Sequence, residues 1–341
     1  MKKRLWQRIA LVAGGILVVA ALVIWFPDIK NLDSLKNSGS QYDVRILRDT
    51  WGVPHIYGKT DPDAAFGLAY AHSEDDFLTI QQTLLSARGM LASVYGQGAA
   101  ANDLMVGLLR VWDQVNAGYD TALAPETKAL VEAYAAGVNR YAAQHPGQVL
   151  TTALFPVTGK DVVAASVVKS PLFFGLDSTL GDLFKDKRAE EISPKPATSS
   201  IGSLFETEFG SNTLAVGPSR SADGSTFLDV NSHQPWSGPV AWYEAHVHSE
   251  QGWDASGALF PATPVIVHGH NPNLGWAFTV NSPDLTDVYV LDINPNNPLQ
   301  YKYDGAWLTL EERQVPIRVR LTGRLVITVP WVRIHSAVVV E

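Results

Sequence analysis

The residues best suited to chemistry in this chain of 341 residues lie in the stretch Phe209-Gly210-Ser211-Asn212-Thr213-Leu214-Ala215-Val216-Gly217-Pro218. There a Gly-Ser step ends a polar, serine-rich segment and opens into an apolar run. If the chain cleaves itself before Ser211, the serine becomes a new N-terminus. Its α-amino group, with a pKa of about 7.7–8.0, can then serve as its own base. Nucleophile and base on one residue is a variant of Ser-His catalysis. The competing interpretation is a plain turn before a strand.

The composition excludes several other kinds of chemistry. The net charge of −8 and the lack of a basic patch interleaved with aromatic residues argue against a nucleic-acid partner. The sequence contains no P-loop and no glycine-rich dinucleotide motif. It has no cysteine, which excludes disulfides, thiolate metal sites and a cysteine nucleophile, and which suits an exported protein. A hydrophobic fraction of 46% describes a globular chain with ample core material.

The N-terminus predicts export. Lys2, Lys3, Arg4 and Arg8 precede an uncharged apolar run from residue 9 to 26. At ~1.5 Å per residue this run nearly spans a hydrocarbon core of about 30 Å. We interpret residues 1–27 as a signal anchor rather than a cleaved signal peptide, because the run ends without a small-x-small cleavage site. The basic flank then stays in the cytoplasm, and the body lies in the periplasm or otherwise outside the inner membrane.

The rest of the chain divides into a helical part and a strand-rich part. Residues 28–41 are polar and predict a tether, and residues 42–184 form a mainly helical region that begins with two strand-like stretches (42–49 and 51–57). In this region Asp61-Pro62 predicts a helix start with Asp61 as the N-cap, and a further helix fits Pro125 to Gln144. Residues 185–210 are charged and carry Ser and Pro, which indicates a linker.

Residues 211–341 alternate like strands, with stretches expected at 213–216, 240–248, 264–268, 275–280, 288–293 and 315–339. Helices followed by strands indicate an α+β fold. The last residues end inside an apolar strand, which complete domains usually cover, so we interpret the chain as incomplete.

Three ordered sets of motifs resemble the penicillin acylase family of N-terminal-nucleophile amidases, which includes acyl-homoserine-lactone and cephalosporin acylases. The first set is residues 48–57 (RDTWGVPHIY) and 69–76 (AYAHSEDD), followed by Arg88-Gly89 and Gly96. The second is Gly210-Ser211-Asn212 together with residues 231–236 (NSHQPW). The third is residues 268–271 (HGHN) and 275–280 (GWAFTV). Together they cover most of the chain after the apolar run.

The resemblance implies a precursor that cleaves itself before Ser211 into a helical α-subunit and a β-subunit, folded as an αββα sandwich that this chain contains only in part. It implies that Ser211 is the nucleophile and that its own amine is the base. His233 matches a residue that contacts this amine, although a structural histidine in a loop remains a competing interpretation. Val280 matches the residue whose backbone N–H serves the oxyanion hole.

The resemblance also assigns residues that bind ligands. The positions of Gln234, His268 and Phe278 correspond to the acyl pocket of a small-molecule N-acyl substrate. The stretch Asp284-Leu285-Thr286-Asp287 resembles a calcium-binding segment, with Asp182 as a further carboxylate, and hard oxygen ligands suit Ca²⁺. Turn-capping roles are the competing interpretation of these aspartates. No organic cofactor is implied.

Two functional hypotheses follow. The first is an amidohydrolase that cleaves an N-acyl amide through an acyl-enzyme at Ser211. The second is a membrane-anchored remnant or acyl-ligand-binding protein without catalysis, because the family's second oxyanion donor, an Asn, lies beyond residue 341. A Ser-His-Asp protease is a weaker third, since the sequence has no Gly-x-Ser-x-Gly elbow.

Overall fold

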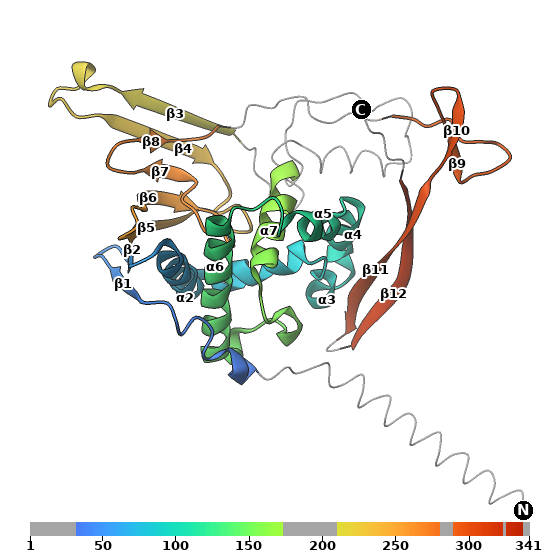
Figure 1. Cartoon of the computed structure of the whole chain (residues 1–341), viewed down its shortest axis with the longest axis horizontal. Helices are drawn as coiled ribbons and strands as arrows, with labels where there is room; N and C mark the ends of the chain where they lie inside the picture. The colour runs from blue at the N-terminus through green and yellow to red at the C-terminus, as the bar shows by residue number, and fades with distance from the viewer. Residues whose placement is uncertain (1–31, 173–209, 280–288, 323–324, 337–341) are drawn as a thin grey trace, which may run out of the picture.

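The computed structural model describes residues 32–172, 210–279, 289–322 and 325–336, and all structural statements refer to them (Figure 1). The α-helices are α2 (Asp61–Ala87), α3 (Ala92–Tyr95), α4 (Ala100–Leu108), α5 (Val111–Gly118), α6 (Pro125–Gln144) and α7 (Gly159–Leu172). The strands are β1 (Val44–Arg48), β2 (Pro54–Gly58), β3 (Gly210–Val216), β4 (Phe227–His233), β5 (Tyr243–Ser249), β6 (Asp254–Leu259), β7 (His268–His270), β8 (Gly275–Trp276), β9 (Gln300–Tyr303), β10 (Ala306–Thr309), β11 (Glu311–Thr322) and β12 (Leu325–Ser336).

One six-stranded sheet joins the two parts of the chain. Its order is β1-β2-β5-β6-β7-β8, with β2 and β5 parallel and the other neighbours antiparallel. Strand β2 precedes Ser211 in the sequence and β5 follows it, so the sheet is continuous across the expected cleavage point. The predicted α+β class is confirmed, but the prediction of helices first and strands second is too simple.

Helix α2 covers the inner face of this sheet and forms the centre of the core. It packs against β1, β2, β5, α6 and α7, and Figure 1 shows it between the sheet and α6. Ile56 and Val247 on the strands and Leu68 and Leu84 on the helix are fully buried. Burial of such side chains stabilises the fold by about 1.5–3 kcal/mol each.

The start of α2 differs from the predicted one. The N-cap is Thr60, whose hydroxyl accepts the backbone N–H of Asp63, while the Asp63 carboxylate accepts the backbone N–H of Thr60. This is a capping box. Asp61 is therefore the first helical residue and not the cap, because a Thr three residues before an Asp satisfies two orphan donors at once. The predicted helix from Pro125 to Gln144 is confirmed by α6.

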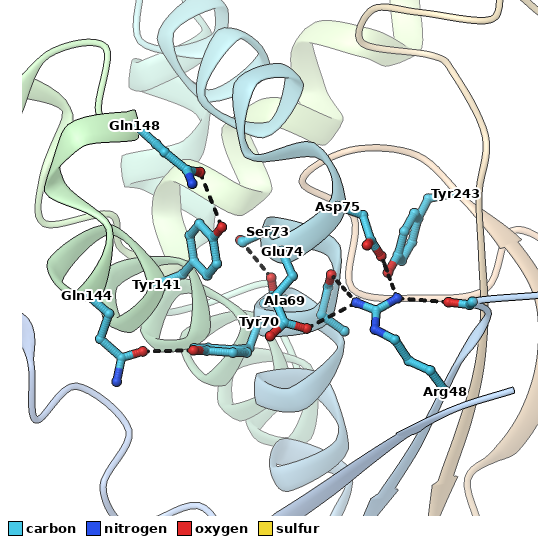
Figure 2. A network of polar contacts seen from close by, with 12 residues as sticks. Arg48, Ala69, Tyr70, Ser73, Glu74, Asp75, Tyr141, Gln144, Gln148 and Tyr243 are labelled. Carbon is cyan, nitrogen blue, oxygen red and sulfur yellow. Dashed lines mark hydrogen bonds and ion pairs between the residues drawn. The ribbon is translucent and has the colours of Figure 1, made fainter.

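A polar network fixes α2 where it bends. Asp76 has non-helical backbone angles (φ −146°, ψ 60°). Just before it, the Arg48 guanidinium pairs with Glu74 (3.0 Å) and Asp75 (2.8 Å), and the Tyr243 hydroxyl donates to Asp75 (2.6 Å) (Figure 2). These residues come from β1, α2 and β5, so the network joins segments from both sides of Ser211. Burial, followed by the hydrogen bond to Asp75, raises the pKa of Tyr243.

A buried ion pair connects α2 to α7. The Arg88 guanidinium contacts both carboxylate oxygens of Asp161, with Nη2 at 2.8 Å from Oδ2. The Asp161 side chain is 1% exposed, and it also accepts hydrogen bonds from the backbone N–H and hydroxyl of Thr158. Among the described residues, Arg88 is the one cation that pairs with this carboxylate.

Arg88→Met is expected to lower the free energy of unfolding by about 3–5 kcal/mol, because it leaves the Asp161 carboxylate buried without a cation. Urea unfolding of the variant and the unchanged protein measures the difference. Arg110→Met is the matched control, since Arg110 pairs with Asp113 at the surface (side chains 44% and 52% exposed), where a pair contributes up to about 1 kcal/mol. Equal losses in the two variants would contradict this prediction.

A second buried cation lies between α7 and the loop after β6. Lys169 is 6% exposed, and its ammonium group donates to the Pro261 carbonyl (2.7 Å) and the Thr263 hydroxyl (2.9 Å). Burial lowers the pKa of Lys169 to about 7. Burial, and then the charge of Lys169, lowers the pKa of His72 to about 3. Both groups are thus largely neutral in the folded chain at alkaline pH.

The low pKa of Lys169 predicts that stability rises with pH. An unfolded lysine has a pKa of about 10.4, so between pH ~7 and ~10.4 the unfolded chain binds one more proton than the folded chain at this group. The contribution to the free energy of unfolding therefore increases by up to about 1.4 kcal/mol per pH unit in that window. Chemical unfolding at several pH values measures this slope. Lys169→Met should remove this slope. If the free energy of unfolding has the same pH dependence in the two proteins, the low pKa of Lys169 is refuted.

Several predicted strands differ in the structure. Residues 264–267 are irregular, with bends at Val265 and Val267, and β7 begins only at His268. The described residues of the expected strand 288–293 contribute one isolated bridge, between Ile293 and Tyr301. The tail expected as one strand is the hairpin of β11 and β12. Its apolar face, with Val315, Ile317 and Val319, packs against α3 and α4, which explains the alternation with Arg.

Candidate active site around Ser211

Ser211 lies at the beginning of a two-stranded ribbon. Strands β3 and β4 are antiparallel, with Gly210 opposite His233 and Ser211 opposite Ser232. Gly210 and Ser211 are half-buried, whereas the rest of β3 is exposed. The Gly-Ser step therefore lies in extended backbone at the beginning of β3 (Figure 1). A turn before a strand is not what is observed, because the strand already includes Gly210.

His233 lies directly beside this step. A Cβ atom on Gly210 would lie 2.9 Å from His233 Nδ1, so glycine is required for the imidazole to pack this close. On its other side, His233 Nε2 is 3.2 Å from the side-chain amide nitrogen of Asn231 and 3.5 Å from that of Asn212. Because amide N–H groups donate, Nε2 acts as the acceptor. The imidazole of His233 is thus held next to Gly210, the residue before Ser211.

His268 contacts the ribbon at Ser232, the residue opposite Ser211. Its Nδ1 is 3.0 Å from the Ser232 hydroxyl, and its Nε2 accepts the backbone N–H of Phe278 (3.2 Å). The ring packs on Trp242 (centroids 4.5 Å apart) and Phe278 (5.9 Å). Burial lowers the pKa of His268. His268 and Phe278, both predicted for the acyl pocket, are therefore in direct contact.

Two polar atoms near this cluster are buried without a hydrogen-bond partner in the part of the chain that the structure describes. They are Oε1 of Gln234 and Nε1 of Trp242. Gln234 is half-buried and follows β4 by one residue. Phe278 is 62% exposed. An uncompensated buried acceptor or donor costs about 1–3 kcal/mol, which a ligand can recover.

The remaining predicted site residues lie outside the described residues. These are Val280 for the oxyanion hole and Asp182, Asp284, Thr286 and Asp287 for calcium. Among the described residues, no group of three or more His, Cys, Asp or Glu side chains is arranged to hold a metal ion. The apolar N-terminal run also lies outside them, and within them no helix combines the length and apolar character needed to cross a membrane.

Sequence reasoning missed two members of the site. Ser232 was noted only as part of the motif 231–236, and Trp242 was not singled out. For Ser232 the only signal in the sequence is its place in the motif 231–236, and its position opposite Ser211 follows from the pairing of β3 with β4. For Trp242 no local signal exists, since its contact with His268 joins residues 26 positions apart.

The chain belongs to the penicillin amidase family, whose model matches residues 43–335. This confirms the resemblance inferred from the motifs, and the family consists of amide-bond hydrolases. The match begins at the first strand, after the apolar N-terminal run.

Curated relatives include acyl-homoserine lactone acylase PvdQ of Pseudomonas fluorescens, 29% identical over 309 residues that cover 85% of this chain and 40% of the relative. Acyl-homoserine lactone acylase QuiP of Pseudomonas aeruginosa is 27% identical over 353 residues, covering 88% and 41%. The chain thus spans about two-fifths of the length of these relatives. A solved thermostable penicillin G acylase from Alcaligenes faecalis is 21% identical, with a TM-score of 0.32 and coverage of 48% of this chain and 91% of that one.

Proposed function

We propose that this chain carries the processing site and nucleophile of an amidohydrolase that cleaves N-acyl amides. One observation supports it most directly: the half-buried Ser211 is the second residue of β3, with His233 held beside the preceding glycine. Membership of the penicillin amidase family supports the same chemistry. Self-cleavage adds water across the Gly210–Ser211 peptide bond and releases the Ser211 amine.

The reaction then follows from the serine and its own amine. Ser211 Oγ attacks the carbonyl carbon of the substrate amide, and its proton passes to the α-amine, directly or through water. The resulting tetrahedral oxyanion accepts a hydrogen bond from the backbone N–H of Val280, the proposed oxyanion-hole donor. Transfer of the proton to the leaving nitrogen breaks the C–N bond and leaves an ester on Ser211. Water hydrolyses this ester by the same proton route and releases the acid.

The substrate is a small molecule with an acyl group. The relatives are named as acylases of acyl-homoserine lactones, which supports an acyl amide as the substrate class. In addition, Gln234 Oε1 and Trp242 Nε1 lack partners beside the proposed pocket. We infer from them an acyl group that bears a polar substituent such as a hydroxyl, which can donate to Gln234 Oε1 or accept from Trp242 Nε1.

Mass spectrometry of the full-length gene product tests the proposal. Processing predicts two fragments, one ending at Gly210 and one beginning at Ser211. The sum of their masses exceeds the mass of the precursor by one water. The two fragments should co-purify under native conditions, because the pairing of β2 with β5 joins them. Hydrolysis of N-acyl amides by the processed protein then tests the reaction. An uncut protein that binds acyl ligands without hydrolysis would support the non-catalytic alternative.

The other expectations from the resemblance stay predictions. They are the αββα sandwich, the anchor and export assigned to residues 1–27, and structural Ca²⁺ at Asp182, Asp284, Thr286 and Asp287. Removal of Ca²⁺ by a chelator should lower the unfolding temperature if the last of these holds, because bound metal stabilises the folded state.

A further inference from the structure

His268 makes two hydrogen bonds that define its protonation state. A backbone N–H can only donate, so the bond from Phe278 requires a lone pair on Nε2 of His268. A neutral imidazole with a lone pair on Nε2 carries its proton on Nδ1. Nδ1–H therefore donates to the Ser232 hydroxyl. The structure thus fixes both the tautomer and the orientation of the ring.

The two bonds join strands that the sheet pairing leaves separate. Ser232 belongs to β4, which pairs only with β3 among the described strands, while His268 belongs to β7 of the six-stranded sheet. Ser232 is opposite Ser211 in the ribbon. Phe278 lies beyond β8 and two residues before Val280 in the sequence. His268 therefore connects the backbone opposite the proposed nucleophile to the backbone at Phe278.

We infer that His268 is a positioning residue for the proposed acyl transfer, and that it holds β4, opposite Ser211, against the backbone at Phe278. This inference rests on the proposed function of Ser211. It reassigns His268 from the acyl pocket, because both ring nitrogens are already bonded within the chain and the side chain is 7% exposed. A group in that state cannot offer a ring nitrogen to a substrate.

The surroundings of His268 keep the imidazole neutral. The ring is packed by Ser232 from β4, Trp242 before β5 and Phe278 after β8, and its register partner on β6 is Ala258. None of these carries a charge, and burial is the cause of the lowered pKa. Protonation of Nε2 would place two N–H donors against each other and break the contact with Phe278.

The test compares three variants of the full-length processed protein on an N-acyl p-nitroanilide. His268→Phe keeps the packing against Trp242 and removes both hydrogen bonds, His268→Gln keeps an acceptor and a donor, and His270→Phe makes the same change at an exposed position of β7. We expect His268→Phe to lower kcat by about 10–100-fold with KM little changed, since a small displacement of reacting groups carries such a cost. His268→Gln should recover much of kcat, and His270→Phe should match the unchanged protein.

A second pair of measurements keeps the inference testable if His268→Phe does not fold. Ser232→Ala removes one of the two bonds and should lower kcat in the same direction by a smaller factor. The ¹⁵N spectrum of the imidazole should show Nε2 without a proton and Nδ1 with one. Unchanged kcat in His268→Phe and Ser232→Ala, or the opposite tautomer, would overturn the inference. An unchanged protein that neither cleaves itself nor hydrolyses any amide would instead refute the proposed function.

Discussion

Ser211→Ala in the full-length protein is expected to yield only uncut precursor and to lower amide hydrolysis by at least ~10³-fold. The substitution removes the oxygen that attacks in both self-cleavage and acyl transfer, and without cleavage the α-amine that serves as base is never released. The methyl side chain fits the half-buried site, so the fold should be retained. Intact mass spectrometry and hydrolysis of an N-acyl p-nitroanilide measure the two losses.

Two controls separate chemistry from folding in this experiment. Ser221→Ala makes the same change at a half-buried loop serine ten residues along the chain and should process and react normally. Ser211→Cys keeps a nucleophile at the same position and should retain partial self-cleavage. A folded Ser211→Ala protein that still cuts itself before residue 211, or still hydrolyses amides, would show that another residue is the nucleophile.

Gly269→Ala is expected to lower the free energy of unfolding by about 3 kcal/mol and to reduce processing and activity with it. Gly269 and Gly257 are directly opposite in β7 and β6. A Cβ atom on Gly269 would lie 2.1 Å from the Ser256 carbonyl oxygen and 2.8 Å from Ile266 Cγ2. Because backbone atoms block the space, the strands must separate, and the cost of such overpacking is about 1–3 kcal/mol or more. The separation also displaces the neighbouring residue His268.

Gly217→Ala is the matched control for the glycine prediction. Gly217 follows β3, has φ −78°, and a Cβ atom there would meet nothing within 4 Å. Its substitution should leave stability and processing unchanged or slightly improved. Urea unfolding of both variants gives the comparison. Equal stability of Gly269→Ala and Gly217→Ala would mean that β6 and β7 are not as close as the structure has them.

Local patterns predicted the elements that local interactions define. Proline near the first turn and an apolar stripe gave the helix from Pro125 to Gln144, and the alternation at 42–49 gave β1. The first error came where two local signals compete: Thr60 and Asp61 can each cap a helix, and only Thr60 finds a reciprocal partner in Asp63. The second came at residues 264–267, where apolar residues without alternation fit an irregular segment as well as a strand.

The sequence by itself determined the chemistry that is available. It supplies Ser211 after a glycine, His233 further along the chain, and the order of motifs that identifies the family. Only the tertiary structure decided how those residues meet. His55 and His246 lie opposite each other in the parallel pair of β2 and β5, and Ser232 meets His268 between β4 and β7. Strand partners separated by up to 191 positions are selected by burial and backbone pairing across the whole core, and no local window of sequence contains both members.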